Sequence, residues 1–171
     1  FEKILRRPIA GSDTAKGTVT VVVKDNALFL TGKGENLAAG LVDGAGGCDP
    51  SGTNNSCGVH IHSGTGCADS TAQGGHFFQS ATDPWALVGY STTSATGAAS
   101  FHGILKGTVD TAKIGNKPFV VHNKGGGRVA CGMIEKDPHK DGHRHANGAF
   151  ARKWTSPAAV LGATAALLAL V

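Results

Sequence analysis

Histidines carry the clearest chemical signal in this sequence of 171 residues. His60 and His62 lie in the strand-like segment CGVHIHSG, and side chains two residues apart on a strand project from the same face. His76 follows two glycines in QGGHFFQ, and His122 ends the apolar segment PFVVHNK. Imidazole suits copper and zinc alike, so this set predicts a metal site without identifying the metal. An HxH pair alone also occurs by chance on surface strands.

Short strands, rather than long helices, are the elements expected to position these histidines. The sequence has 26 glycines and only 16% charged residues. Glycine inside a helix costs about 1 kcal/mol relative to alanine, so glycines scattered this densely favour turns. Asp25-Asn26 is expected to turn the first hairpin, and 40–56 to form a long loop. Seven or eight short strands predict an all-β sandwich or barrel, with candidates at 18–23, 28–30, 59–62, 85–90, 98–103, 119–122 and 128–134.

The four cysteines are expected to form two disulfides. They are Cys48, Cys57, Cys67 and Cys131. Their number is even and no CxxC pair occurs among them, which disfavours a zinc finger or a thioredoxin-like site. Disulfides form and persist in oxidising compartments, so the cysteines favour an extracellular location. A glycosylation sequon at 54–56 is consistent with secretion.

Net charge and length exclude some functional classes. The formal net charge of +4 is too small to argue for nucleic acid, and the sequence has no Lys/Arg run and no aromatic platform. No nucleic-acid partner is therefore expected. The length suits one domain with a sizeable core. We expect a lead-in at 1–16, the domain at 17–135, a polar His-rich stalk at 136–147 and a C-terminal signal at 148–171.

The end of the chain has the layout of a signal for a GPI lipid anchor. Small residues at 147–149 precede a short spacer and a terminal apolar segment, 157–171, which is shorter than the roughly 20 residues that span a bilayer. Asn147 would be the attachment residue, and the segment after it would be removed. The alternatives are a short core helix or a tail-anchored span. The histidines of the stalk can bind metal, but a solvated stalk is the simpler interpretation.

Taken together, the strings GVHIHSG, a histidine preceded by glycine, VVH and GGGRVACGMI resemble the copper,zinc superoxide dismutase family in order and local sequence. The resemblance covers roughly residues 17–135. It implies a Greek-key β-barrel or sandwich of about eight antiparallel strands. It also implies an enzyme that converts superoxide to oxygen and hydrogen peroxide.

The resemblance assigns roles to individual residues. His60, His62 and His122 would be the permanent copper ligands, and His76 the fourth, which would leave reduced copper and carry a proton. Arg128 would guide superoxide to the copper; a strand-edge arginine without function is the alternative. Cys67 and Cys131 match the family's disulfide, which leaves Cys48 and Cys57 as an extra bridge.

Two departures point to the copper-only, cell-surface branch of that family. Residues 77–101 contain no histidine and one acid, Asp83, so one copper and no zinc are expected. Only 123–127 separate His122 from Arg128, where the family has a charged loop of some twenty residues, so the site should be open. Asp83 or Tyr90 would replace zinc as the partner of His76, although Asp83-Pro84 also fits an ordinary turn.

The expected protein is thus an extracellular, GPI-anchored, copper-dependent superoxide dismutase that is a monomer or weak dimer and touches the membrane through its lipid only. The first alternative is a non-catalytic cell-surface copper-binding module, which would typically lack a ligand or the arginine. The second is a zinc hydrolase built on HxH, which would need a carboxylate base, and no HExxH element is present.

Overall fold

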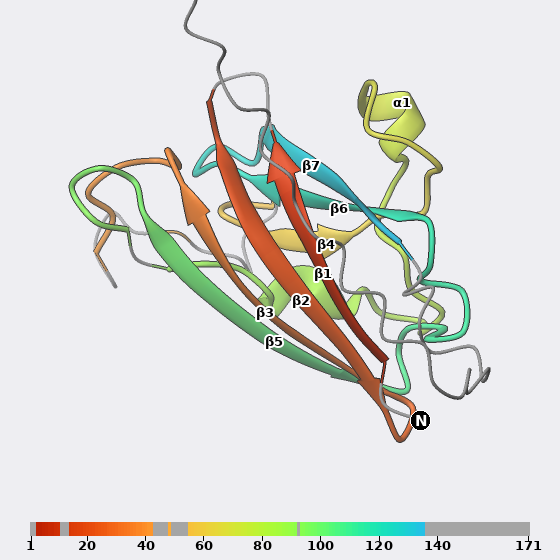
Figure 1. Cartoon of the computed structure of the whole chain (residues 1–171). Coiled ribbons are helices and arrows are strands. Elements are labelled where there is room, and N and C mark those ends of the chain that lie inside the picture. Colours follow the sequence, from red (N-terminus) through yellow and green to blue (C-terminus); the bar gives the residue numbers. More distant parts are fainter. Residues whose placement is uncertain (1–2, 11–13, 43–47, 49–54, 92, 136–171) are drawn as a thin grey trace, which may run out of the picture. The chain divides into compact units, whose positions relative to one another are not determined.

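The computed structural model describes residues 3–10, 14–42, 48, 55–91 and 93–135, the first range as backbone only. These residues form seven strands (Figure 1), which are β1 (Lys3–Ala10), β2 (Lys16–Lys24), β3 (Ala27–Glu35), β4 (Val59–Ile61), β5 (Ala99–Lys106), β6 (Lys117–His122) and β7 (Arg128–Ile134). The short helix α1 (Ser70–Gln73) and the 3-10 helix η1 (Pro84–Leu87) lie between β4 and β5. Of the chain's two compact units, 1–141 and 142–171, the second lies outside the described residues.

All neighbouring strands pair antiparallel, in the order β4-β6-β7-β1-β2-β3-β5 (Figure 1). Two ladders make up this order, β4-β6-β7 and β1-β2-β3-β5, and the single pair Ala10–Cys131 joins them. The all-β prediction is confirmed. Within the described part of the chain no ladder connects β4 to β5, so a closed barrel is not formed by these pairings.

The chain passes between the two ladders three times, from β3 to β4, from β4 to β5 and from β5 to β6. The longest of these connections, 62–98, carries α1 and η1 and contains His62, His76 and Asp83. Side chains from both ladders share one buried cluster, in which the rings of Phe101 on β5 and Phe119 on β6 stack at 5.9 Å. Trp85, Val88 and Tyr90 of the connection belong to the same cluster, so the connection is packed onto the core that the two ladders share.

The first hairpin follows the sequence prediction. Asp25 and Asn26 both have positive φ, 49° and 57°, and Lys24 pairs with Ala27 across them. Two consecutive residues with positive φ are the geometry of a type I′ turn, which asparagine and aspartate tolerate better than most residues. In contrast, β1 was not predicted: residues 3–10, expected as a lead-in, pair with β2 along their whole length. The sequence of this segment, with Pro8 after two arginines, gives no strand pattern, and its pairing is a tertiary effect.

The strand predicted at 85–90 is wrong, because residues 84–87 form the 3-10 helix η1. Pro84 occupies the first helical position, where its missing N–H costs nothing and its fixed φ suits a helix. Asp83 caps the helix by accepting a hydrogen bond from the Trp85 backbone N–H at 2.9 Å. Trp85 is fully buried, and its Nε1–H donates to the carbonyl of Phe77 at 2.9 Å. This local signal outweighs the apolar character of 85–90.

Candidate metal centre

Strand β4 brings His60 and His62 into the interior on one face. All three residues of β4 are buried, and β4 pairs with β6 in the register His60–Val120. His62 directly follows β4, and its backbone N–H donates to the Pro118 carbonyl at 2.8 Å, which continues the ladder by one residue. The two rings stack with centroids 6.2 Å apart and planes 22° apart. The expectation that they share a face is confirmed.

His76 reaches the same place through backbone pairing with His62. The two residues form an isolated antiparallel bridge, flanked by hydrogen bonds from Ser63 N to Gly75 O at 2.7 Å and from Phe77 N to Ile61 O at 2.8 Å. This pairing places the His76 ring 4.2 Å from that of His60 and 5.1 Å from that of His62, centroid to centroid. His76, 14 positions after His62 in the sequence, thereby lies next to the rings of His60 and His62.

Three of the four histidines form a compact set of potential ligands. One ring nitrogen from each of His60, His62 and His76 lies within 4.8 Å of the other two, so these residues could hold a metal ion. His122 borders the set without belonging to it, with its ring centroid 4.9 Å from that of His60, 5.5 Å from that of His62 and 6.4 Å from that of His76. The sequence predicted all four as ligands, and the structure brings three together and places the fourth beside them.

Buried ring nitrogens without partners indicate that the set fits a metal. Both ring nitrogens of His60 and Nε2 of His62 are buried without a hydrogen-bond partner. Such groups are rare in folded proteins and call for an explanation, a bound ion among them. The neighbouring rings are already oriented, since Nδ1 of His62 lies 2.9 Å from the Gly74 carbonyl and Nδ1 of His122 lies 3.2 Å from the Gly58 carbonyl. A proton on each Nδ1 leaves the lone pair of Nε2 free, as metal binding by histidine requires.

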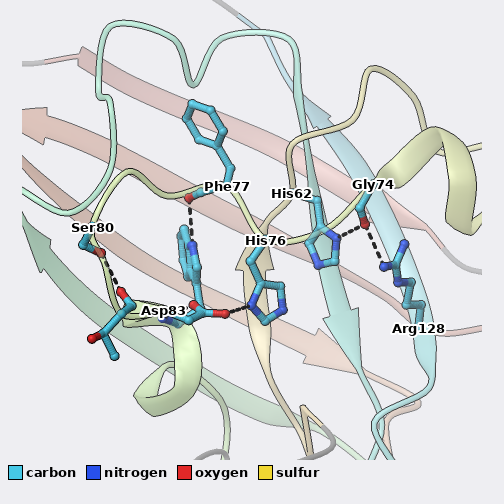
Figure 2. A network of polar contacts seen from close by, with 9 residues as sticks. His62, Gly74, His76, Phe77, Ser80, Asp83 and Arg128 are labelled. Carbon is cyan, nitrogen blue, oxygen red and sulfur yellow. Dashed lines mark hydrogen bonds and ion pairs between the residues drawn. The ribbon is translucent and has the colours of Figure 1, made fainter.

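A carboxylate fixes the His76 ring. Nδ1 of His76 lies 2.5 Å from Oδ2 of Asp83 (Figure 2), and the His76 side chain is only 12% exposed. The other oxygen of Asp83 caps η1, so the same residue starts the helical turn and orients the His76 ring. Tyr90, the other candidate for this contact, instead donates its hydroxyl to the His122 carbonyl at 2.7 Å. Burial raises the pKa of Tyr90 to about 12, so the hydroxyl keeps its proton as a donor.

Arg128 lies at the edge of the histidine set and is held by the connection that carries α1. Its Nη2 donates to the Gly74 carbonyl at 2.7 Å, and the same carbonyl lies 2.9 Å from Nδ1 of His62 (Figure 2). Its Nη1 donates to the Ser70 carbonyl at 2.9 Å and to Oε1 of Gln73 at 3.0 Å. Arg128 is itself exposed, at the start of β7. Gln73 was not anticipated, because nothing in its local sequence distinguishes it.

Burial keeps His60, His62 and His122 uncharged in the absence of metal. It lowers the pKa of His60 to about 2, with further lowering by the charges that His76, His122 and His62 would carry. Burial likewise lowers the pKa of His122 to about 3 and that of His62 to about 4, partly opposed by their backbone hydrogen bonds. The positive charge of Arg128 lowers the pKa values of His62 and His122 further. Neutral imidazoles are the form that binds metal ions.

Two disulfides, Cys67–Cys131 and Cys48–Cys57, join the pairs that the resemblance implied. Cys67–Cys131 ties the segment before α1 to β7, the strand that begins with Arg128. Cys48–Cys57 attaches Cys48 to the core, in which Cys57 is fully buried. Disulfides fit an oxidising, extracellular environment.

The stalk, Asn147 and the apolar segment at 157–171 lie outside the described residues. In the part of the chain that is described, no helix is long and apolar enough to cross a membrane. No protein-family model matches the chain, and no curated protein matches it either.

The lowered histidine pKa values predict that the metal-free chain loses stability as the pH falls. His60, His62 and His122 have folded pKa values below the ordinary 6.5, so below about pH 6.5 the unfolded chain binds more protons than the folded chain. Each histidine that titrates only in the unfolded chain removes up to about 1.4 kcal/mol per pH unit between its two pKa values.

Urea unfolding of the metal-free chain at pH 7.5 and pH 5 measures this loss. His62→Gln should reduce the dependence on pH, while His102→Asn, at an exposed position of β5, serves as the control. Equal unfolding free energies at both pH values would contradict the assignment of buried neutral imidazoles.

Proposed function

We propose that the chain is a copper-dependent superoxide dismutase. The observation that carries the proposal is an exposed guanidinium held by the same backbone carbonyl that orients a ring of the histidine set. A redox metal alone would suit many binding proteins. A fixed cation beside it suits a small anionic substrate.

His60, His62, His76 and His122 would hold the copper, one ion per chain and no zinc. A set made only of imidazole nitrogens fits copper, and the partnerless nitrogens of His60 and His62 supply ligand atoms that no other group uses. When bound, copper would supply one-electron chemistry through its cuprous and cupric states. The resemblance in sequence to the copper-only branch of the copper,zinc superoxide dismutases supports this choice of metal.

Arg128 would attract superoxide and hold it beside the histidine set. Its charge is permanent, and its planar group of donors suits an anion of two oxygen atoms. The side chain is exposed, while its two bonds from Nη1 and one from Nη2 direct the guanidinium toward the connection that carries His76. Diffusing anions therefore meet the positive charge at the edge of the site.

His76 would handle protons for the reaction. Two superoxide anions and two protons give one oxygen and one hydrogen peroxide, so the site must deliver protons as well as attract anions. With Nδ1 on Asp83, the His76 ring keeps Nε2 as the atom that can take up and release a proton. Asp83 holds the ring in place through that cycle and stabilises its protonated form.

The remaining features of the proposal follow the resemblance. The two ladders and the connections that cross between them would belong to a Greek-key fold of about eight strands, of which the described residues form seven without closing a barrel. The disulfides are consistent with an extracellular protein. It would be attached to the cell surface through a GPI lipid at Asn147. Superoxide would be the only substrate, and the enzyme would act as a monomer or weak dimer.

A non-catalytic copper-binding module is the second candidate. The observation that favours it is the position of His122, which lies beside His60, His62 and His76 and outside the set whose ring nitrogens lie within 4.8 Å of one another. Three histidines without the fourth ligand would suit a protein that binds copper without turnover. Copper binding without turnover would identify such a module.

Metal content measured together with superoxide consumption tests the proposal. The full-length chain with His139, His143 and His145 replaced by alanine, so that the tail cannot bind metal, should hold about one copper and negligible zinc. It should consume superoxide rapidly. Arg128→Ala should lower the rate about tenfold or more without emptying the site, because the side chain supplies charge and no ligand. Two metals per chain, or copper without turnover, would contradict the proposal.

Asp83→Asn tests the role given to His76. The amide can still cap η1, but it cannot stabilise a charged His76 ring, so activity or copper affinity should fall about tenfold or more. The pH dependence of the rate should also change, since the variant alters a proton-carrying group. Ser80→Ala is the matched control, because Ser80 lies in the same turn and its hydroxyl donates to the Thr82 carbonyl at 2.6 Å, away from His76 (Figure 2). Equal pH profiles for Asp83→Asn and the parent would contradict the assignment.

A further inference from the structure

Helix α1 carries a glutamine whose side chain is directed at Arg128. Gln73 is the one buried residue of α1, with 8% of its surface exposed. Its Oε1 accepts a hydrogen bond from Nη1 of Arg128 at 3.0 Å, a contact between residues 55 positions apart in the sequence. A guanidinium can only donate, so the amide must present its oxygen to this partner. The contact therefore fixes the orientation of both groups.

The helix that carries Gln73 has anchors besides its hydrogen bonds to Arg128. Asp69 caps it by accepting from the Ala72 N–H at 2.8 Å, and the Gly64 N–H donates to the carbonyl of Gln73 at 2.9 Å. A Cβ on Gly64 would overlap the Ala72 carbonyl, so glycine allows this close approach. The Cys67–Cys131 disulfide ties the segment before α1 to β7. Gln73 thus extends toward Arg128 from a fixed support.

The acceptors around Arg128 share one property, which is that none of them carries a charge. They are the carbonyls of Ser70 and Gly74 and the side-chain amide of Gln73. A carboxylate at position 73 would also accept the bond, but it would cancel the positive charge of the guanidinium. The amide holds the group in place and leaves its charge available to an anion.

We infer that Gln73 is a positioning residue for Arg128, holding the guanidinium beside the histidine set so that it receives the anionic substrate. Gln73 acts through Arg128 and contacts no reacting atom. The identity of the anion, superoxide, rests on the proposed function, whereas the contact between Gln73 and Arg128 can be tested without it.

The contact is tested first by chemical modification of the metal-free chain. Phenylglyoxal, an arginine-selective dicarbonyl, is applied, and modification of the peptide that contains Arg128 is followed by mass spectrometry. Gln73→Met removes the acceptor at similar side-chain length, and Arg128 should react at least about threefold faster. Gln73→Glu keeps the acceptor, and Arg128 should react no faster than in the parent. Thr71→Met, an exposed position on the same helix, should leave the rate unchanged.

The role is tested next in the copper-loaded chain. The rate constant for superoxide should fall at least about threefold in Gln73→Met, with copper content unchanged. In Gln73→Glu the rate should fall and its dependence on ionic strength should weaken, because the carboxylate cancels the steering charge. Combined with Arg128→Ala, Gln73→Met should cause no further loss, since the glutamine acts only through the arginine.

The failure of this inference is distinguishable from failure of the proposed function. Equal modification of Arg128 in Gln73→Met and the parent would overturn the inference, whatever the activity. A further loss of rate on adding Gln73→Met to Arg128→Ala would overturn it as well. If the parent chain consumed no superoxide, the proposed function would fail while the modification rates still decided the contact. Should Gln73→Met not fold, Gln73→Glu, which has the same size, carries the test through its ionic-strength dependence.

Discussion

Imidazole rings buried against one another are tolerable only while they are neutral, and this constraint governs the centre of the molecule. His60, His62 and His122 are each at most 1% exposed, and burial holds the pKa of each far below its ordinary value. A neutral ring still has two nitrogens that need partners, and three such nitrogens have none. The unpaired nitrogens cost stability in the metal-free chain. A metal ion bound by one nitrogen of each ring would offset part of that cost, which is why the cluster is better explained as a metal site than as core packing.

Backbone carbonyls, rather than charged side chains, organise most of the site. The Gly58 and Gly74 carbonyls orient the rings of His122 and His62, and the Gly74 carbonyl also receives the guanidinium of Arg128. Neutral acceptors of this kind fix a ring without adding charge to a buried cluster. The exception is Asp83, whose carboxylate contacts His76, the least buried histidine of the set. Among the described contacts of His62 and His76, the charged groups Asp83 and Arg128 lie at the border of the site, and Lys117 lies close by, with its Nζ donating to the Ser63 carbonyl at 2.7 Å. This division suits a site that must bind a cation and admit an anion.

The sequence predicts the parts of this site that depend on local pattern. The HxH pair follows from the alternation of side chains along β4, and the hairpin at Asp25-Asn26 follows from turn chemistry. The approach of His76 and His122 could be predicted only through a family resemblance, because it depends on pairing between distant segments. The strand expected at 85–90 fails because Asp83-Pro84 starts a helical turn. The sequence gives no indication of the contact between Gln73 and Arg128, since nothing near Gln73 in the sequence identifies its partner. Its role depends on a contact across 55 positions.

The central claim is that the buried histidines form one metal site, and spectroscopy of the copper-loaded full-length chain tests it most directly. With the stalk histidines replaced by alanine, electron paramagnetic resonance should show one type of cupric ion with nitrogen hyperfine coupling. Replacing His60 by alanine should abolish or reshape that spectrum, because the His60 ring, whose nitrogens have no hydrogen-bond partner, would supply one of the ligand nitrogens. An unchanged spectrum in the His60 variant would place the copper elsewhere and contradict the account.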